Sequence, residues 1–471
     1  SLSLFWHGAR TALFDSSTYL YRFYCARFSA HINIFSRIFD LMSGVTHYAF
    51  CLGRRFPSLI TIACSYCTMK YLQKKLQRAF SAFLLALTFL AIPHAHAEVP
   101  ALFSFTGSGF GHGVGMSQMG AKIRALSGES ATAILNYYYK DVVVAPYPDT
   151  ATIRINIAHA VRTLSLLTNA ADSSMQIYAG DIPIGTPATP VLNFAARQKV
   201  TVQLEANSLT FNGQVAPGKV FTVRWFGATP VITFSQSNVT TRYRYGQIQI
   251  KIVKKALEVT NSLSVHDEYL LGLSEMPSHW PSAALDAQVI AARSYALSKT
   301  GTIRSDCDCH VYDHISDQNF VGYAKEIEKK IGINWRSAVL RTNVDSATSL
   351  TVLSKGKPIQ AYYFSSSGGA TQTTQDAWGQ PSAYTQSVAD PGSLDTAHNP
   401  RFAKWSATST QALVAAAFLL PNITTLEILS RNSAGAVTSI KGIASDGAFK
   451  ILRGDTFRSR AKIPSPYFYL S

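Results

Sequence analysis

The middle of the chain alternates apolar and polar residues with the period of a β-strand. Residues 152–157 run T-I-R-I-N-I and residues 247–252 run Q-I-Q-I-K-I. Because successive side chains of a strand point to opposite faces of a sheet, this alternation produces one apolar face. Gly and Pro turns separate such runs between about 151 and 262. The pattern predicts a β-rich region and leaves open whether it is a module of its own.

Other stretches have the spacing of an α-helix. Between 120 and 140, four apolar residues recur at helical intervals: Ile123, Leu126, Ile134 and Leu135. Ser130 can cap the second half of that helix. From 281 to 299, Pro281 fits a first turn and alanines fill the middle. Short strands resume at 335–375 around a hairpin turn at 356–357. We therefore predict an α+β fold, β-rich with a few helices, in which the 281–299 helix packs on a sheet.

The first hundred residues differ from the rest and have the features of an export signal. Met69 precedes a positively charged region, an apolar run at 79–92 and an A-H-A cleavage site at 95–97. The apolar run is shorter than the roughly 20 residues of a membrane-spanning helix. We expect a signal peptide at 69–97, no transmembrane span after its cleavage, and a secreted, extracellular or cell-wall-associated mature protein. We interpret residues 1–68 as a doubtful, unfolded translation of upstream sequence.

Composition and charge narrow the class of partner. The 471 residues are 47% hydrophobic and 15% charged, enough to bury a sizeable core. The net charge of the whole chain is +16. Without the 10 basic and 2 acidic residues of 1–97, 33 basic and 25 acidic residues remain. No basic run, RNA-binding signature or helix-turn-helix pattern accompanies this charge, so we expect no nucleic-acid partner. An anionic cell surface fits the remaining charge, and ordinary solubility explains it equally well.

Three blocks of sequence carry the candidate chemistry. Residues 269–277 (Y-L-L-G-L-S-E-M-P) lead into a helix with A-Q-V-I-A-A-R-S-Y-A at 287–296. Residues 361–369 (A-Y-Y-F-S-S-S-G-G) are followed by W-G at 378–379, and residues 109–118 run G-F-G-H-G-V-G-M-S-Q. Together these blocks resemble the SpoIID/LytB-domain family, the stage II sporulation protein D-like proteins. The resemblance covers roughly 103–145 and 240–471.

The order of the blocks departs from the family pattern. In the sporulation protein the G-H-G-V-G-M-S-Q block follows the other motifs, whereas here it is permuted to their N-terminal side. Permutation is tolerated where the two ends of a fold lie close together at the surface. We therefore expect the glycine block to reach the same cleft from the other end of the chain.

The resemblance implies a lytic transglycosylase, which cleaves MurNAc-GlcNAc bonds in peptidoglycan glycan strands lacking stem peptides and forms 1,6-anhydroMurNAc. Glu275 is the candidate catalytic acid. Ordinary glycosidases need two carboxylates, but here the substrate's own C6 hydroxyl is the nucleophile and one carboxylate suffices. Desolvation by apolar neighbours would raise its pKa, and the competing interpretation is an acidic residue near a helix start. Some relatives are described as amidase enhancers, so the alternative function is a non-catalytic wall-binding protein that serves a cell-wall amidase.

Two blocks supply candidate substrate-binding residues besides Glu275. His112 and Gln118 lie in a glycine-rich loop whose backbone N–H groups can approach a sugar closely. This loop lacks the lysine and the serine or threonine of a phosphate-binding loop, which argues against nucleotide binding. Gln288, Arg293 and Tyr295 could face the cleft, and Arg293 and Tyr295 could equally anchor the helix to the sheet.

The third block contributes hydroxyl groups. Ser365, Ser366 and Ser367 are suited to hydrogen bonds with sugar hydroxyls. A serine nucleophile would need a positioned histidine and acid, which no motif here supplies. We therefore assign these serines to substrate binding.

A second candidate site lies at 306–314, D-C-D-C-H-V-Y-D-H. Cys307, Cys309, His310 and His314 are ligand types that bind zinc, and some family members hold zinc in this loop. Their cysteines lie further apart, so a Cys307–Cys309 disulfide and free thiols remain alternatives. After residue 97 these are the last two cysteines, which excludes a scaffold of several disulfides. We expect no cofactor in catalysis and a structural zinc at most.

These observations divide the chain into five segments. The first two are the doubtful segment and the signal peptide at 1–68 and 69–97. The mature chain then comprises the glycine-loop and helix part at 98–150, a β-rich region of unknown role at 151–240 and the main SpoIID-like domain at 241–471.

Overall fold

Strands outnumber helices in the computed structural model, which describes residues 98–471. The predictions for 1–68 and 69–97 lie outside the described residues. Within 98–471, no helix is both long enough and apolar enough to cross a membrane. The predicted α+β, β-rich fold class is confirmed.

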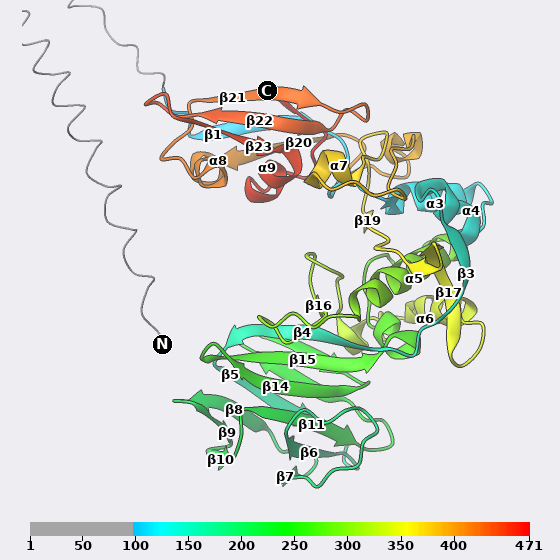
Figure 1. The fold of residues 1–471 in the computed structure, drawn as a ribbon, viewed down its shortest axis with the longest axis vertical. Coiled ribbons are helices and arrows are strands. Elements are labelled where there is room, and N and C mark those ends of the chain that lie inside the picture. Colours follow the sequence, from blue (N-terminus) through cyan, green and yellow to red (C-terminus); the bar gives the residue numbers. More distant parts are fainter. Residues whose placement is uncertain (1–97) are drawn as a thin grey trace, which may run out of the picture. The chain divides into compact units, whose positions relative to one another are not determined.

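The strand-rich middle forms two large sheets (Figure 1). The seven-stranded sheet has the order β16 (Val311–Tyr312), β4 (Thr152–Val161), β15 (Ala256–Ser264), β14 (Gln247–Val253), β11 (Val220–Phe226), β6 (Ser174–Ala179) and β7 (Leu192–Phe194). Its neighbours are antiparallel except β16, which pairs with β4 in parallel. The six-stranded sheet has the order β10 (Gln214–Ala216), β9 (Ser208–Phe211), β8 (Val200–Glu205), β5 (Thr163–Thr168), β12 (Ile232–Gln236) and β13 (Val239–Tyr243).

The alternation read from the sequence explains how these sheets pack. Ile248 and Ile250 of β14 are fully buried, as are Phe211 on β9 and Phe221 on β11. The rings of Phe211 and Phe221 meet edge to face at 5.4 Å, so the two sheets share a core. The expected boundary at 240/241 falls inside β13, and in the seven-stranded sheet strands from both sides of it pair, as β11 does with β14. The β-rich region is therefore continuous with the segment that follows it.

Four of the helices pack together with one small sheet. The first two are α3 (Gln118–Leu126) and α4 (Ala131–Tyr138), and the sheet consists of β3 (Val143–Pro148), β17 (Thr348–Ser354) and β18 (Lys357–Pro358). Helix α5 (Ser282–Lys299) contacts α3, α4, β17 and α6 (Gly332–Arg341). The expected helix at 281–299, and its packing on a sheet, are confirmed.

Two of the helix predictions need correction. A single helix over 120–140 is wrong, because the chain breaks at Gly128, whose φ of 89° is left-handed. Ser130 does cap the second helix, and its side chain accepts from the N–H of Ala133 at 3.2 Å. The strands expected from 335 begin only after α6 ends at Arg341.

The C-terminal residues build a second core together with the first described strand. Strand β1 (Leu102–Gly107) lies between β20 (Trp405–Thr410) and β24 (Phe468–Leu470). A second three-stranded sheet contains β21 (Thr425–Arg431), β22 (Val437–Ile443) and β23 (Phe449–Arg453), with helices α8 (Gln411–Phe418) and α9 (Gly454–Arg460). Phe105, Phe418, Phe457 and Phe468 are the large side chains of this core.

Short elements connect these parts. They are β2 (Met116–Ser117), β19 (Tyr363–Phe364), α7 (Thr374–Trp378) and the helical turns η1 (Val265–Tyr269), η2 (Gly322–Ala324) and η3 (Pro391–Leu394). Strands β2 and β19 form a parallel two-stranded sheet of their own.

Candidate active site

The glycine block and the serine block lie side by side. Met116 pairs with Tyr363, and the backbone groups of Phe110 and Ser366 exchange hydrogen bonds of 2.7 and 3.1 Å. The approach is close enough to demand glycine: a Cβ on Gly115 would stand 1.9 Å from the carbonyl oxygen of Tyr362. Two blocks about 250 residues apart in sequence are thereby joined into one surface.

Gln118 links this surface to the block that contains Glu275. The Gln118 Nε2 donates to the backbone oxygen of Glu275 at 3.1 Å and to Gln288 Oε1 at 3.1 Å. Both glutamine side chains are buried. The permuted block therefore reaches the residues around Glu275.

Glu275 is held by two donors on one oxygen. Its Oε1 accepts from the backbone N–H of Asn319 at 2.7 Å and from the hydroxyl of Tyr363 at 3.0 Å. No donor within residues 98–471 reaches Oε2, and the side chain is only partly buried. Oε2 is therefore the oxygen left to exchange a proton with a bound molecule.

Burial raises the pKa of the Glu275 carboxyl above its usual value. The hydrogen bonds from Asn319 and Tyr363 and the charge of Lys325 act in the opposite direction, because each favours the ionised form. Lys325 is itself buried, and its Nζ donates to the backbone oxygen of Met276 at 2.8 Å. A carboxyl group with a raised pKa can serve as a proton donor nearer neutral pH.

A chain of side chains behind Glu275 fixes the Tyr363 hydroxyl. Gln318 Nε2 donates to that hydroxyl at 2.8 Å, and the hydroxyl of Tyr269 donates to Gln318 Oε1 at 2.8 Å. Sequence reasoning missed these residues, although Tyr363 and Tyr269 both stand inside the quoted blocks. Gln318 and Asn319 belong to a loop with no motif, so the sequence offered no comparable signal for them.

His112 is packed among aromatic rings. Its ring lies 5.5 Å from that of Phe364 and 5.2 Å from that of Trp378, and its Nδ1 accepts from the N–H of Val114 at 3.0 Å. Burial lowers the pKa of His112 to about 4, so the imidazole is neutral at neutral pH. A neutral ring in this position orients the glycine loop, and a contact with substrate stays a prediction.

Arg293 anchors helix α5 in place of facing the cleft. It is fully buried, its Nε stands 3.0 Å from Asp149 Oδ2, and its Nη1 donates to the backbone oxygen of Leu350 at 3.0 Å. Burial lowers the pKa of its guanidinium to about 10. The anchoring alternative therefore replaces the expected substrate contact, because a ligand cannot reach a side chain enclosed in this way.

Two further side chains of α5 are also buried in the fold. Tyr295 is buried, and its hydroxyl donates to Asp317 Oδ1 at 2.8 Å. Gln288 is fully buried, and its Nε2 has no hydrogen-bond partner within 98–471. Both side chains support the residues around Glu275 from within the fold.

The three serines of the third block differ in burial. Ser366 and Ser367 are fully buried, and Ser367 Oγ donates to Asp390 Oδ2 at 2.7 Å. Asn399 donates to Ser366 Oγ at 2.9 Å. Ser365 alone is partly exposed. The structure corrects the assignment of Ser366 and Ser367 to sugar binding, because their hydroxyls are enclosed, and it leaves Ser365 as a candidate.

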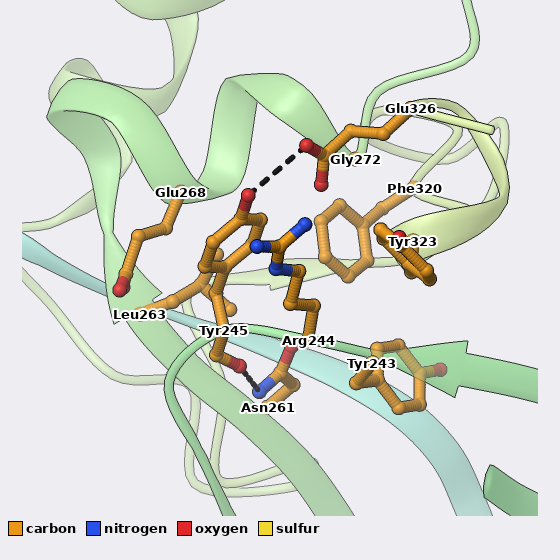
Figure 2. A pocket seen from close by; sticks show the side chains of 11 residues that line it. Tyr243, Arg244, Tyr245, Asn261, Leu263, Glu268, Gly272, Phe320, Tyr323 and Glu326 are labelled. Carbon is orange, nitrogen blue, oxygen red and sulfur yellow. Dashed lines mark hydrogen bonds between the residues drawn. The ribbon is translucent and has the colours of Figure 1, made fainter. Parts of the chain in front are cut away.

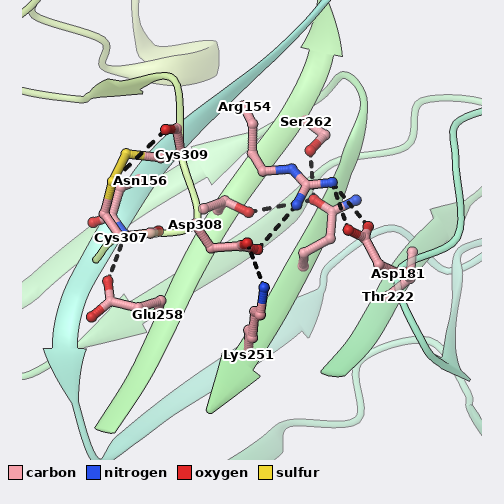
Figure 3. Close-up of polar contacts among 12 residues, drawn as sticks. Arg154, Asn156, Asp181, Thr222, Lys251, Glu258, Ser262, Cys307, Asp308 and Cys309 are labelled. Carbon is pink, nitrogen blue, oxygen red and sulfur yellow. Dashed lines mark hydrogen bonds and ion pairs between the residues drawn. A yellow bond between two sulfur atoms is a disulfide. The ribbon is translucent and has the colours of Figure 1, made fainter. Parts of the chain in front are cut away.

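The loop at 306–314 contains a disulfide between Cys307 and Cys309 (Figure 3). It covers the polar face of the seven-stranded sheet, where Arg154 Nη1 pairs with Asp308 at 3.0 Å and Lys251 pairs with it at 2.7 Å. His310 Nδ1 accepts from the N–H of Arg154 at 2.9 Å.

Of the three alternatives left open for these cysteines, the structure contains the disulfide. His314 is exposed and stacks on Tyr312, with ring centroids 5.2 Å apart. No group of three or more His, Cys, Asp or Glu side chains within 98–471 is arranged to hold a metal. Zinc binding through Cys307, Cys309, His310 and His314 stays a prediction.

Comparisons with known proteins agree with the resemblance read from the motifs. Residues 253–348 match the family model SpoIID, described as stage II sporulation protein. This range includes Glu275, α5 and the disulfide loop, whereas the glycine and serine blocks lie outside it. The resemblance to the SpoIID family is thereby confirmed for this segment.

Three curated relatives match parts of the chain. The amidase enhancer of Bacillus subtilis (strain 168) is 32% identical over 111 residues, 24% of this chain and 13% of that protein. Stage II sporulation protein D of the same organism is 25% identical over 170 residues, 35% of this chain and 49% of that protein. An uncharacterised protein of Brachyspira hyodysenteriae is 30% identical over 148 residues, 31% of this chain and 37% of that protein. The chain thus spans about half or less of each relative, and no solved structure matches it.

Proposed function

Since the chain carries a SpoIID-family segment, we propose that it is a cell-wall protein and a lytic transglycosylase. The proposed substrate is a peptidoglycan glycan strand lacking stem peptides, and the proposed reaction cleaves the MurNAc-GlcNAc bond. The observation that supports it most is Glu275, a carboxyl group with a raised pKa and one oxygen free of protein donors.

Glu275 would act twice in one turnover. Its protonated Oε2 donates to the glycosidic oxygen as the bond to the anomeric carbon breaks. The C6 hydroxyl of the same MurNAc residue then attacks that carbon and returns its proton to Glu275, which closes the 1,6-anhydro ring. Proton and leaving group balance, so no water and no second carboxylate is consumed.

The residues on Oε1 support this assignment of the proton. Asn319 N–H and the Tyr363 hydroxyl both donate to Oε1, so the carboxylic proton resides on Oε2. The same two donors stabilise the carboxylate once the proton has left. They therefore oppose the rise in the pKa of Glu275 that desolvation causes.

The second candidate is a non-catalytic amidase enhancer. The relative that carries this name is similar over 24% of the chain, and the six-stranded sheet, which lies outside the family segment, offers a surface for wall binding. Such a protein would bind glycan without cleaving it and would accelerate an amidase. The partly buried Glu275, with its raised pKa, favours the enzyme.

Glu275→Gln separates the two functions. Purified residues 98–471 are incubated with glycan strands with and without stem peptides, and products are identified by mass spectrometry. We expect anhydro-ended fragments from stripped strands with the parent protein and a loss of at least a hundredfold in the variant, because a general acid contributes about 10²–10⁴. The amide oxygen of the introduced glutamine still accepts from both Oε1 donors, so glycan co-sedimentation should survive.

The matched control is Glu129→Gln, a partly buried glutamate outside the three sequence blocks. It pairs with Arg124 at 2.7 Å and lies neither at Glu275 nor among the residues that line the hollow beside the Glu275 loop. We expect its product release to remain within a few-fold of the parent. Equal release by the Glu275 variant and the parent would exclude the acid role, and binding without cleavage by the parent would favour the enhancer.

A further inference from the structure

A hollow beside the Glu275 loop is lined by aromatic and charged side chains (Figure 2). Its water-accessible volume is about 10 Å³, which leaves room for one small polar group such as a carboxylate oxygen. Its rings are Tyr243, Tyr245, Phe320 and Tyr323, and its charged groups are Arg244, Glu268 and Glu326.

The hollow shares its wall with the Glu275 site. Gly272, which lines it, precedes Glu275 by three residues. Phe320, which also lines it, directly follows Asn319, the residue whose N–H binds Glu275. Leu273 and Phe320 form a β-bridge between these two segments. The hollow therefore adjoins the loop that holds Glu275.

Arg244 stands in the hollow without a hydrogen-bond acceptor. Its guanidinium lies 5.5 Å from the ring centroid of Tyr245 and 5.6 Å from that of Tyr323, and it makes no hydrogen bond or ion pair within 98–471. Stacking between two rings holds the planar group while its N–H donors stay available. Such a group matches a carboxylate, which accepts two parallel hydrogen bonds.

Glu326, in contrast to Arg244, has an acceptor oxygen that lacks a hydrogen-bond donor. Its side chain is 7% exposed, and Oε2 accepts from the Tyr245 hydroxyl at 3.0 Å and from Arg336 Nη1 at 2.7 Å. Its Oε1 is buried and has no partner within 98–471. A buried acceptor without a donor is costly, so a ligand that supplies an N–H or O–H would be stabilised here.

The two acidic side chains of the hollow do not neutralise the positive charge of Arg244. The charge of Glu326 is balanced by its contact with Arg336, and Glu268 accepts a backbone hydrogen bond from Ser264 at 2.9 Å. Burial also raises the pKa of the Glu268 carboxyl, which weakens its repulsion of an anion. Arg244 thus remains the unpaired charge of the hollow.

We propose that this hollow binds the lactyl carboxylate of an N-acetylmuramic acid residue, with Arg244 as its ligand and Glu326 as the acceptor for a neighbouring N–H or hydroxyl. The inference rests on the proposed glycan substrate and gives it a specificity. Only a strand without stem peptides offers that carboxylate as a free anion, because a stem peptide converts it to an amide.

The test compares two forms of one ligand on the full mature chain carrying Glu275→Gln, so that no strand is cleaved. Stripped glycan strands are used as such or after their lactyl carboxylates have been converted to methylamides, and affinity is measured by co-sedimentation. We expect the carboxylate form to bind on the order of tenfold more tightly, as for a charge-assisted pair. Arg244→Gln should abolish this preference, and Arg244→Lys should retain part of it.

Arg242→Gln is the matched control, since Arg242 is an exposed arginine two residues earlier, on β13, and does not line the hollow. It should keep the full preference. Equal affinity for both strand forms, or an undiminished preference in Arg244→Gln, overturns the inference. Cleavage is measured separately with Glu275 intact. If strands are cleaved but the carboxylate form is not preferred, only this inference is refuted. If the carboxylate form is preferred but strands are not cleaved, only the transglycosylase activity is refuted.

Discussion

At the scale of single residues, the carboxyl group of Glu275 is set by opposing influences. Desolvation raises its pKa, whereas Asn319, Tyr363 and Lys325 lower it. The sequence suggested apolar neighbours alone as the source of a shift. Because the opposing donors converge on one oxygen, changing either donor alters the proton affinity without removing the acid.

Tyr363→Phe tests this balance. The variant removes one donor that stabilises the carboxylate, so the pKa of Glu275 should rise further. A general acid must be protonated, and the alkaline limb of the kcat/KM profile should therefore move to higher pH. We expect kcat at the optimum to fall about two- to tenfold, as for one lost hydrogen bond. A limb that stays in place would show that Tyr363 does not act on the titrating group.

The stability of Glu275→Gln should depend on pH. A carboxyl whose folded pKa is raised binds its proton more tightly in the folded state, so its contribution to stability is present below the unfolded pKa and is lost as pH rises through the folded pKa. At neutral pH, above the unfolded pKa, Glu275 then destabilises the fold, and glutamine should raise Tm by roughly 1 to 3 °C. Below about pH 4 the gain should disappear. A gain of equal size at both pH values would contradict the raised pKa.

How far the sequence could point to the candidate site depended on the residue. Glu275 and Gln118 could be singled out because they stand in long blocks whose residues the fold brings together, and their roles stay predictions. Asn319 was missed because it acts through its backbone N–H, which every residue except proline has. Arg293 was left open between facing the cleft and anchoring the helix, and Ser367 was assigned to sugar binding because its hydroxyl suits a sugar. The burial of both side chains, which is a property of packing, was not readable from the blocks.

At the scale of secondary-structure elements, α5 is the support of the site. Small residues fill its middle, and Ala287, Ala291 and Ala292 are fully buried, so neighbouring helices approach closely. Ser294 Oγ lies 2.7 Å from the carbonyl oxygen of Val352 on β17, which ties the helix to the small sheet. The helix itself was predictable from its proline and alanines. The break at Gly128 was not, because the apolar spacing continues across it.

Arg293→Met should destabilise the protein without a specific effect on substrate binding. It removes the arginine partner of Asp149, whose remaining side-chain contact is the His266 ring at 2.6 Å, and it leaves the backbone oxygen of Leu350 without a donor. Removing one partner of a buried ion pair costs about 3–5 kcal/mol, to be measured by urea unfolding. Arg293→Lys, which retains the charge, should lose less. A raised KM with an unchanged unfolding midpoint would instead restore the substrate-binding role.

The disulfide loop permits an independent chemical test. After residue 97 the sequence contains only Cys307 and Cys309, so thiol titration of denatured residues 98–471, prepared without reductant, reports on this pair alone. We expect no thiol before reduction and two per chain after it. Two thiols accompanied by stoichiometric zinc in elemental analysis would show that the zinc form is the one that exists.

At the scale of the whole described chain, the position of β1 accounts for the unusual order of the motifs. Phe105 pairs with Leu470, and the N–H of Ser471 donates to the oxygen of Ser104 at 3.1 Å. The first and last described strands are thus antiparallel neighbours in one sheet. A chain that left β24 through a hairpin could enter β1 directly, which would place the glycine block after the other motifs.

A circular permutant tests whether this adjacency is sufficient. Ser471 is joined to residue 99 by about five Gly, Ser and Asn residues, enough for a hairpin connection, and the chain is opened between Thr150 and Ala151. Thr150 is exposed, while Asp149 before it keeps its contacts with Arg293 and His266 from the new C-terminus. We expect native circular dichroism and a Tm within about 5 °C of the parent, because the core contacts are unchanged and only one connection is lost.

The control permutant has the same linker but is opened inside α5, after Asp286. It should not fold, since the opening interrupts a buried helix. If both permutants fail alike, the β3–β4 connection is itself required, and proximity of the ends does not explain the permuted order.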